Sequence, residues 1–153
     1  MAPHLVPDDP DARLDLARTI LAAQPFSRLL GTEITAFGDG HAVLRLAIGD
    51  DHRQQFGLVH GGVHAYLADN ALTFAAGSVL GPSVLTETVS VTYLRAARNG
   101  VLEARAHVTE HGEGSARCEV EIVNLDAGGT ATVSARANGS ARSTTATSGT
   151  SAG

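Results

Sequence analysis

Cysteine is scarce in this sequence, and lysine and tryptophan are missing altogether. The single cysteine, Cys118, has no partner for an internal disulfide bond, which is typical of a reducing compartment. The polar, acidic N-terminus lacks the apolar segment of a secretory signal. The longest apolar stretch, Val63–Leu80, is interrupted by a histidine, an aspartate and an asparagine, which membrane-spanning helices rarely carry. We therefore expect a cytoplasmic protein that does not enter a membrane.

Positive charge is also limited, because the net charge is −5 and the arginines form no cluster. This composition argues against nucleic-acid binding. Arg95 and Arg98 are the nearest approach to a basic pair and could attract an anionic ligand. Aromatic residues make up only 4% of the chain, so they identify no ligand pocket. With 43% hydrophobic residues among 153, the chain is long enough to bury a core.

The composition predicts one domain between two flexible ends. We expect a leader over residues 1–10, a single domain over 11–140, and a disordered tail rich in Ser, Thr, Ala and Gly over 141–153. The domain opens with apolar residues at helical spacing, which predict an amphipathic helix over residues 11–24. Pro25 ends this helix, and one further turn is expected over 26–30.

The remaining pattern predicts an antiparallel sheet around one helix. Residues 61–80 are apolar on nearly every side, which is typical of a helix covered by other elements. Strand alternation and turn residues predict a hairpin and four later strands, over residues 33–37, 41–48, 84–97, 101–111, 115–126 and 130–140. Each strand has one apolar face. The expected class is α+β, with a curved antiparallel sheet packed on a central helix.

The segment Gln54–Thr73 carries the chemistry. Gly61 and Gly62 stand where a loop becomes a helix, and glycines let another molecule approach the backbone closely. The free N–H groups at a helix start attract a carbonyl oxygen that gains negative charge. The pair could instead serve only close packing between the helix and the sheet.

Asp69 is predicted to be a buried carboxylate, because it lies within the apolar helix. Such a group needs a partner or a purpose. Gly61 and Asp69 are eight residues apart, roughly 12 Å along a helix, so one copy can hardly place both at one carbonyl. Two antiparallel copies in a two-fold dimer can, and we therefore predict a site shared across a homodimer. The alternative is that Asp69 only caps a neighbouring backbone group.

His60-Gly61-Gly62, followed by Leu67–Ala71, resembles the hotdog-fold thioesterases of the phenylacetate-degradation (PaaI-like) type. The likeness extends from Pro25 to about Arg142. It implies a hotdog fold with an extra N-terminal helix and hydrolysis of an acyl-CoA, aryl or medium-chain, to free acid and coenzyme A. It implies no cofactor beyond the coenzyme A of the substrate, and a homodimer that could pair into a tetramer.

The resemblance assigns roles by position. The Gly61 N–H would contact the thioester oxygen, and Asp69 of the partner subunit would be general base or nucleophile. His60 would lie near the leaving sulfur, although it could merely brace the loop. Thr86 falls where the family often has a hydroxyl that holds the water. Thr73 could act similarly, because residues four apart share a helix face.

Gln54 departs from the family pattern, which often has asparagine there. Its amide can donate the same hydrogen bond from a side chain one methylene longer. On the predicted strand 84–97, Thr86 and Thr88 share a hydroxyl-bearing face with Ser90 and Thr92, which we interpret as a wall of the substrate channel or as a packing face.

Gly62 would allow close approach of the substrate. Arg95 and Arg98 could reach the phosphates of coenzyme A or simply be solvated.

Other chemistries fit the sequence less well. His60, His64 and Asp69 have the wrong spacing to hold a metal from one helix face, so no metal is expected. Cys118 lies on the apolar face of a strand and is expected in the core. Two alternative functions stay open, a non-catalytic acyl-CoA or aromatic-ligand binding protein and a hotdog enoyl-CoA hydratase.

Overall fold

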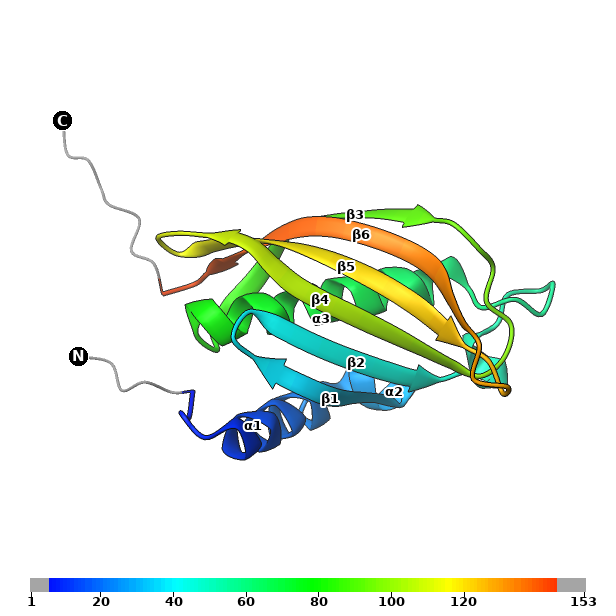
Figure 1. The fold of residues 1–153 in the computed structure, drawn as a ribbon, viewed down its shortest axis with the longest axis horizontal. Coiled ribbons are helices and arrows are strands. Elements are labelled where there is room, and N and C mark those ends of the chain that lie inside the picture. Colours follow the sequence, from blue (N-terminus) through cyan, green and yellow to red (C-terminus); the bar gives the residue numbers. More distant parts are fainter. Residues whose placement is uncertain (1–5, 146–153) are drawn as a thin grey trace.

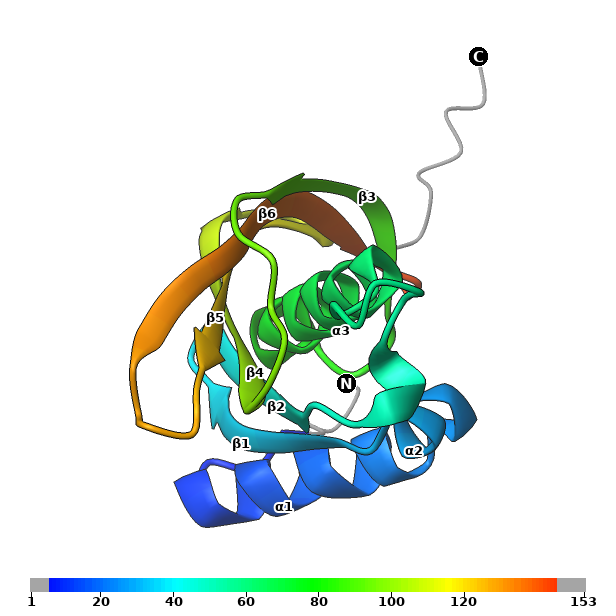
Figure 2. The same ribbon diagram turned by 90° about the vertical axis from the view of Figure 1, so that its right-hand side faces the viewer.

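The computed structural model describes residues 6–145, in which a six-stranded antiparallel sheet curves around one long helix, α3 (Gly61–Leu80) (Figures 1 and 2). The spatial order of the strands is β1-β2-β4-β5-β6-β3. The strands are β1 (Thr32–Gly38), β2 (His41–Ala47), β3 (Val84–Tyr93), β4 (Val101–His111), β5 (Ser115–Leu125) and β6 (Ala131–Ser143). The predicted α+β class with a central helix is confirmed.

The N-terminal helices cover the β1 edge of the sheet, as Figure 2 shows for α1 (Pro10–Ala22) and α2 (Pro25–Leu30). Asp9 caps α1 by accepting a hydrogen bond from the Ala12 N–H at 2.8 Å, and Pro10 occupies the first helical position. Buried Ala17 and Leu21 face inward from α1. This helix begins one residue earlier than the sequence predicts.

Helix α3 is apolar because the sheet surrounds most of it. Leu67, Ala68, Ala71, Leu72 and Ala75 are fully buried and form the centre of the core. One stripe of the helix is left uncovered by the sheet, and Asp69 on that stripe is exposed. The prediction that Asp69 is buried is therefore wrong for the single protomer. Hydropathy places the carboxylate in an apolar helix but does not show which side the sheet leaves open.

Strand β3 changes face at a bulge. It pairs with β6, and Thr86 lies opposite Ala141 while Thr88 lies opposite Ser140, so Glu87 is an extra residue in the ladder. Thr86 therefore faces α3, whereas Thr88 is exposed and contacts the Ser140 hydroxyl at 3.0 Å. The predicted continuous wall of hydroxyls from Thr86 to Thr92 is wrong, because the bulge inverts the alternation after Thr86.

The ends of the last strands also differ from the prediction. β6 continues to Ser143, beyond the expected domain boundary at residue 140, because its final residues pair with the start of β3 at Val84. Strand β3 stops at Tyr93 instead of 97, where the N–H groups of Leu94 and Arg95 both donate to the Ser134 carbonyl. Residues 1–5 of the predicted leader and 146–153 of the predicted tail lie outside the described residues.

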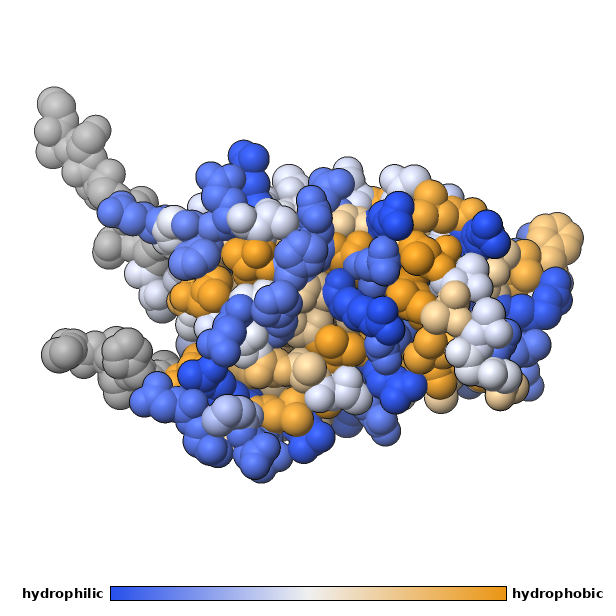
Figure 3. Space-filling view, in the orientation of Figure 1, coloured by the Kyte–Doolittle hydropathy of each residue, from blue (hydrophilic) through white to orange (hydrophobic). Residues whose placement is uncertain are grey.

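Hydrophilic side chains run across the outer surface of the sheet, with hydrophobic patches between them (Figure 3). Ion pairs join neighbouring strands there, including Arg136 with Glu121 at 3.3 Å and Arg45 with Glu103 at 3.2 Å. This face is solvated, and the core lies on the opposite side of the sheet. Among helices within residues 6–145, none has the length and hydrophobicity to cross a bilayer.

Candidate active site

The start of α3 leaves one backbone amide available. His60 is the N-cap, and its ring Nδ1 accepts a hydrogen bond from the Gly62 N–H at 2.8 Å. The Val63 N–H donates to the His60 carbonyl at 3.0 Å. Within the part of the chain that is described, the Gly61 N–H has no such acceptor. Of the two predicted glycines, Gly61 is thus the available donor, whereas the Gly62 N–H is engaged by His60.

Tyr93 packs against this helix start, although no pattern in the sequence identified it as a site residue. Its hydroxyl donates to the Gly61 carbonyl at 3.0 Å, although the two residues are 32 positions apart. A Cβ at Gly61 would lie 3.3 Å from the tyrosine ring. Glycine at this position therefore lets the aromatic ring rest against the backbone and hold it in place.

Gln54 lies in the loop before α3. The predicted loop contains a short 3-10 helix, η1 (Asp50–His52), and then a turn in which the Gly57 N–H donates to the Gln54 carbonyl at 3.0 Å. The Gln54 side-chain oxygen accepts a hydrogen bond from the Phe56 N–H. Because the oxygen is used in this way, the amide NH₂ of Gln54 is the end left to donate.

The second cluster surrounds Asp69 in the middle of α3. The Thr86 hydroxyl donates to Asp69 Oδ1 at 2.5 Å, and the Thr73 hydroxyl lies 2.8 Å from that of Thr86. The single hydroxyl proton of Thr73 is shared between the Asp69 backbone carbonyl at 2.8 Å and Asp69 Oδ1 at 3.4 Å. The three predicted side chains are thus brought together, and two hydroxyls orient one exposed carboxylate.

Within one protomer, the two clusters remain apart. Gly61 is the first residue of α3, and Asp69 lies eight positions later on the same straight element, roughly 12 Å away. A thioester carbonyl that contacts the Gly61 amide cannot also contact Asp69 of the same chain. One protomer therefore supplies the two halves of a site at separate positions.

Arg95 and Arg98 lie beside the helix start, as a CoA-binding role would need. Both are exposed, and neither forms an ion pair with another residue of the described chain. The segment that carries them is held against the loop before α3, because the Val59 N–H donates to the Ala97 carbonyl at 2.9 Å. An Arg98 guanidinium nitrogen lies 3.5 Å from where a Cβ on Gly57 would be.

His64 is a buried structural residue. Its Nε2 lies 2.8 Å from the Ser134 hydroxyl, which donates its only proton to the Arg95 carbonyl at 2.7 Å, so Nε2 must carry the proton of the neutral ring. Burial lowers the pKa of His64 from its ordinary value of 6.5, and the backbone of His60 raises it by a smaller amount. His64 thus anchors the segment after β3 and is directed away from Asp69.

The structure also shows the surroundings of Cys118 and of the side chains that could bind a metal. Cys118 is buried in the core, and burial raises the pKa of its thiol to about 11, which keeps it protonated and unreactive. Across residues 6–145, no three His, Cys, Asp or Glu side chains are grouped closely enough to hold a metal ion.

A polar network beside Asp69 was not predicted. The Tyr66 hydroxyl donates to Ser27 at 2.7 Å, Ser27 donates to Gln24 at 2.6 Å, and Asn70 donates to Gln24 at 3.1 Å. These side chains line a hollow that also includes Asp69. Tyr66 and Asn70 are four apart on α3, which is the only signal in the sequence that could have linked them.

Comparisons with known proteins agree with this fold. The family model described as "Thioesterase superfamily" matches residues 56–131, which include the start of α3, Asp69 and Thr86. The domain belongs to the thioesterase superfamily and has its hotdog fold.

Individual relatives give the same picture. The chain is 28% identical over 97 residues to the 1,4-dihydroxy-2-naphthoyl-CoA hydrolase of Listeria monocytogenes, covering 62% of this chain and 79% of that protein. It is 26% identical over 117 residues to human acyl-coenzyme A thioesterase 13, covering 74% and 84%. A mutant structure of the phenylacetic acid degradation protein PaaI from Thermus thermophilus superposes with a TM-score of 0.69 at 26% identity, covering 78% and 99%.

Proposed function

We propose that the protein hydrolyses an acyl-CoA thioester to a free acid and coenzyme A. The observation that carries this proposal is the pairing, on one helix, of an available amide at Gly61 with a carboxylate held by two hydroxyls at Asp69. The names of the relatives, a CoA hydrolase and an acyl-CoA thioesterase, support the same chemistry. The reaction calls on no metal or redox cofactor.

The site is completed by a second copy of the chain. The uncovered stripe of α3 carries Asp69 and is free to face another protomer. In a two-fold dimer with antiparallel α3 helices, Gly61 of one protomer meets Asp69 of the partner subunit. Two equivalent sites result, each with residues from both chains. A tetramer of two such dimers stays a prediction, as does a cytoplasmic location.

The chemistry follows from the groups present. The Gly61 N–H, with the Gln54 amide as a second donor, stabilises the negative charge that develops on the thioester oxygen. Asp69 removes a proton from water that attacks the carbonyl carbon, with Thr73 and Thr86 orienting the carboxylate. Alternatively, Asp69 attacks first and forms an anhydride, which water then hydrolyses. Either route expels the coenzyme A thiolate, which takes up a proton from the site or solvent.

Gly61→Pro tests the amide directly. Proline suits the first helical position, and His60 before it already has ψ 136°, which proline permits. The matched control is Gly61→Ala, which adds the same Cβ beneath Tyr93 but keeps the N–H. We expect thiol release from an acyl-CoA to fall roughly 100- to 1,000-fold further in Gly61→Pro than in Gly61→Ala. Equal rates in the two variants would remove the amide from the mechanism.

Mixing two inactive variants tests the shared site. A hybrid dimer of Gly61→Pro and Asp69→Asn has one site with both native groups and one site with neither. Random reassortment should therefore restore about a quarter of wild-type activity, because half of the dimers are hybrids with one working site. If the mixture stays as inactive as its components after verified subunit exchange, the site is not shared. Binding of acyl-CoA without turnover by the wild type would indicate the binding-protein alternative.

A further inference from the structure

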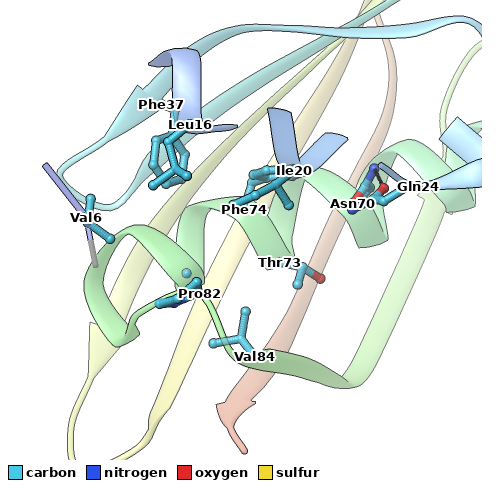
Figure 4. A pocket seen from close by; sticks show the side chains of 11 residues that line it. Val6, Leu16, Ile20, Gln24, Phe37, Asn70, Thr73, Phe74, Pro82 and Val84 are labelled. Atoms are coloured by element: carbon cyan, nitrogen blue, oxygen red, sulfur yellow. Dashed lines mark hydrogen bonds between the residues drawn. The ribbon is translucent and has the colours of Figure 1, made fainter. Parts of the chain in front are cut away.

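An apolar pocket of about 120 Å³ lies between α1, α3 and the beginning of β3 (Figure 4). Apolar side chains from these elements, from β1 and from the adjoining loops surround it: Val6, Leu16, Ile20, Phe37, Phe74, Pro82 and Val84. Polar side chains line it as well, namely Gln24, Asn70 and Thr73. An apolar pocket with a few polar groups is the usual form of a small-molecule binding site.

Thr73 belongs both to the lining of this pocket and to the cluster of side chains around Asp69. It lines the pocket, and its hydroxyl lies 2.8 Å from that of Thr86, which donates to Asp69. Asp69, Thr73 and Gly77 follow one another at four-residue steps, so they lie along one side of α3. The stripe therefore runs from the carboxylate to the wall of the pocket.

We propose that this pocket binds the acyl part of the thioester and limits it to a compact apolar group, a single ring or a short branched chain. This rests on the proposed hydrolysis, because the carbonyl must then lie beside Asp69. An engineered apolar cavity of about 150 Å³ holds benzene, so a pocket of this volume suits a ring-sized group and leaves the end of a long fatty chain outside. The neighbouring hollow beside Tyr66 is lined by polar side chains bonded to one another and suits an acyl group less well.

Gly77 sets the width of the pocket. It lies inside α3, where glycine costs about 1 kcal/mol relative to alanine. Neither backbone strain nor tight packing demands it, because a Cβ there would meet only the Val84 side chain, at an ordinary 3.5 Å. A Cβ on Gly77 would instead occupy space beside the pocket. Gly77 is therefore a specificity-determining residue for the acyl group.

The N-terminal helix supplies the opposite wall. Leu16 and Ile20 of α1 face the pocket across from Phe74 and Val84 (Figure 4). Acyl selectivity is thus divided between the central helix and a helix outside the sheet, whereas the reacting groups are on α3 and β3.

Two opposite changes of volume test the proposal. Gly77→Ala narrows the pocket and should lower the ratio of kcat/KM for phenylacetyl-CoA to that for acetyl-CoA at least tenfold. Val84→Ala widens it and should raise kcat/KM for octanoyl-CoA relative to butanoyl-CoA about fourfold, the worth of one buried methylene. The matched control for Val84→Ala is Val89→Ala, on the same strand and packed on the core but not in the pocket. Val89→Ala should leave both ratios unchanged.

Binding of neutral probes separates this proposal from the proposed reaction. Phenylacetamide and hexanamide resemble the acyl groups without a charge that Asp69 would repel, and NMR titration of the full chain measures their affinity. We expect Gly77→Ala to weaken phenylacetamide binding at least fivefold. A wild type that binds phenylacetamide but hydrolyses no acyl-CoA would contradict the reaction and keep the pocket. Unchanged probe affinity and unchanged ratios in Gly77→Ala and Val84→Ala would overturn the pocket.

Discussion

The Thr86 hydroxyl donates a hydrogen bond to Oδ1 of Asp69 at 2.5 Å. The two residues come from different elements, so this bond fixes the carboxylate of α3 against the first part of β3. A hydrogen bond to a charged group is worth about 1.5–3 kcal/mol, enough to hold the carboxylate in one orientation. The proposed mechanism depends on that orientation.

Removing the Thr86 hydroxyl should lower kcat. Thr86→Val keeps the shape of the side chain, and we expect kcat to fall roughly 10- to 100-fold, because the carboxylate loses its strongest contact. Thr73→Val should cost less, and the double variant should cost less than the product of the two, since the hydroxyls are 2.8 Å apart. Thr88→Val, on the outer side of the same strand, is the matched control. Equal effects of Thr86→Val and Thr88→Val on kcat would refute the role of Thr86.

Replacing the carboxylate should abolish most turnover. Asp69→Asn is nearly isosteric but cannot accept a proton from water, so we expect kcat to fall about 100- to 10,000-fold. Because asparagine keeps the shape of the side chain and an oxygen that can accept from Thr86, the midpoint of thermal unfolding should stay close to that of the wild type. Asp51→Asn, at another exposed aspartate, is the control. Steady-state thiol release that differs little between the two variants would contradict the mechanism.

The amide of Gln54 should matter through its donor end. Gln54→Glu keeps the oxygen that accepts from the Phe56 N–H but replaces the NH₂ group with a negatively charged oxygen. We expect kcat/KM to fall roughly 100- to 1,000-fold, because the developing oxyanion then loses a donor. Gln55→Glu introduces the same charge at the exposed neighbouring position and should have little effect. If both variants behave alike, the general charge of the loop, rather than the Gln54 donor, governs the rate.

The free energy of unfolding should decrease as the pH is lowered, because of His64. Burial lowers its pKa below 6.5, so the unfolded chain binds a proton more readily than the folded one. The stabilisation from the neutral ring is complete above about pH 6.5 and is lost as the pH falls toward the folded pKa. Urea unfolding at pH 7.5 and 5.5 should show a larger loss of unfolding free energy in the wild type than in His64→Gln. An identical loss in both proteins would show that other groups dominate.

The sequence was sufficient to predict the layout of the fold. Alternation along strands such as Val101–His111, together with glycine-rich turns, is local information, and the structure places this strand at the predicted residues. Helix 61–80 was predicted with its observed bounds because the apolar run begins at Gly61 and ends before Gly81 and Pro82. The structure brings Asp69, Thr73 and Thr86 together. The four-residue spacing links Thr73 with Asp69, whereas Thr86 was selected through the family resemblance.

Features that depend on distant partners could not be predicted in this way. The exposure of Asp69 depends on where the sheet stops, and the contact of Tyr93 with Gly61 joins residues from separate elements. The capture of the Gly62 N–H by His60 depends on the side-chain and backbone geometry of the cap, and sequence letters do not specify this. Each of these features concerns which face or which atom is available, which the sequence pattern does not specify.

Because of the bulge at Glu87, β3 directs a hydroxyl-bearing residue inward before the bulge and apolar residues inward after it. Before Glu87, the Thr86 hydroxyl is directed at the reacting groups, and after it Val89 and Val91 pack on the core. Gly139 on β6 leaves room for the Thr88 carbonyl, because a Cβ on residue 139 would collide with that carbonyl. If Glu87 instead paired with Ser140 in a regular ladder, each later residue of the strand would shift by one position. Val89 and Val91 would then move to the water-facing side, and Thr88, Ser90 and Thr92 would move into the apolar interior. The one extra residue therefore lets the same strand contribute to a hydrated reaction centre and to a dry core.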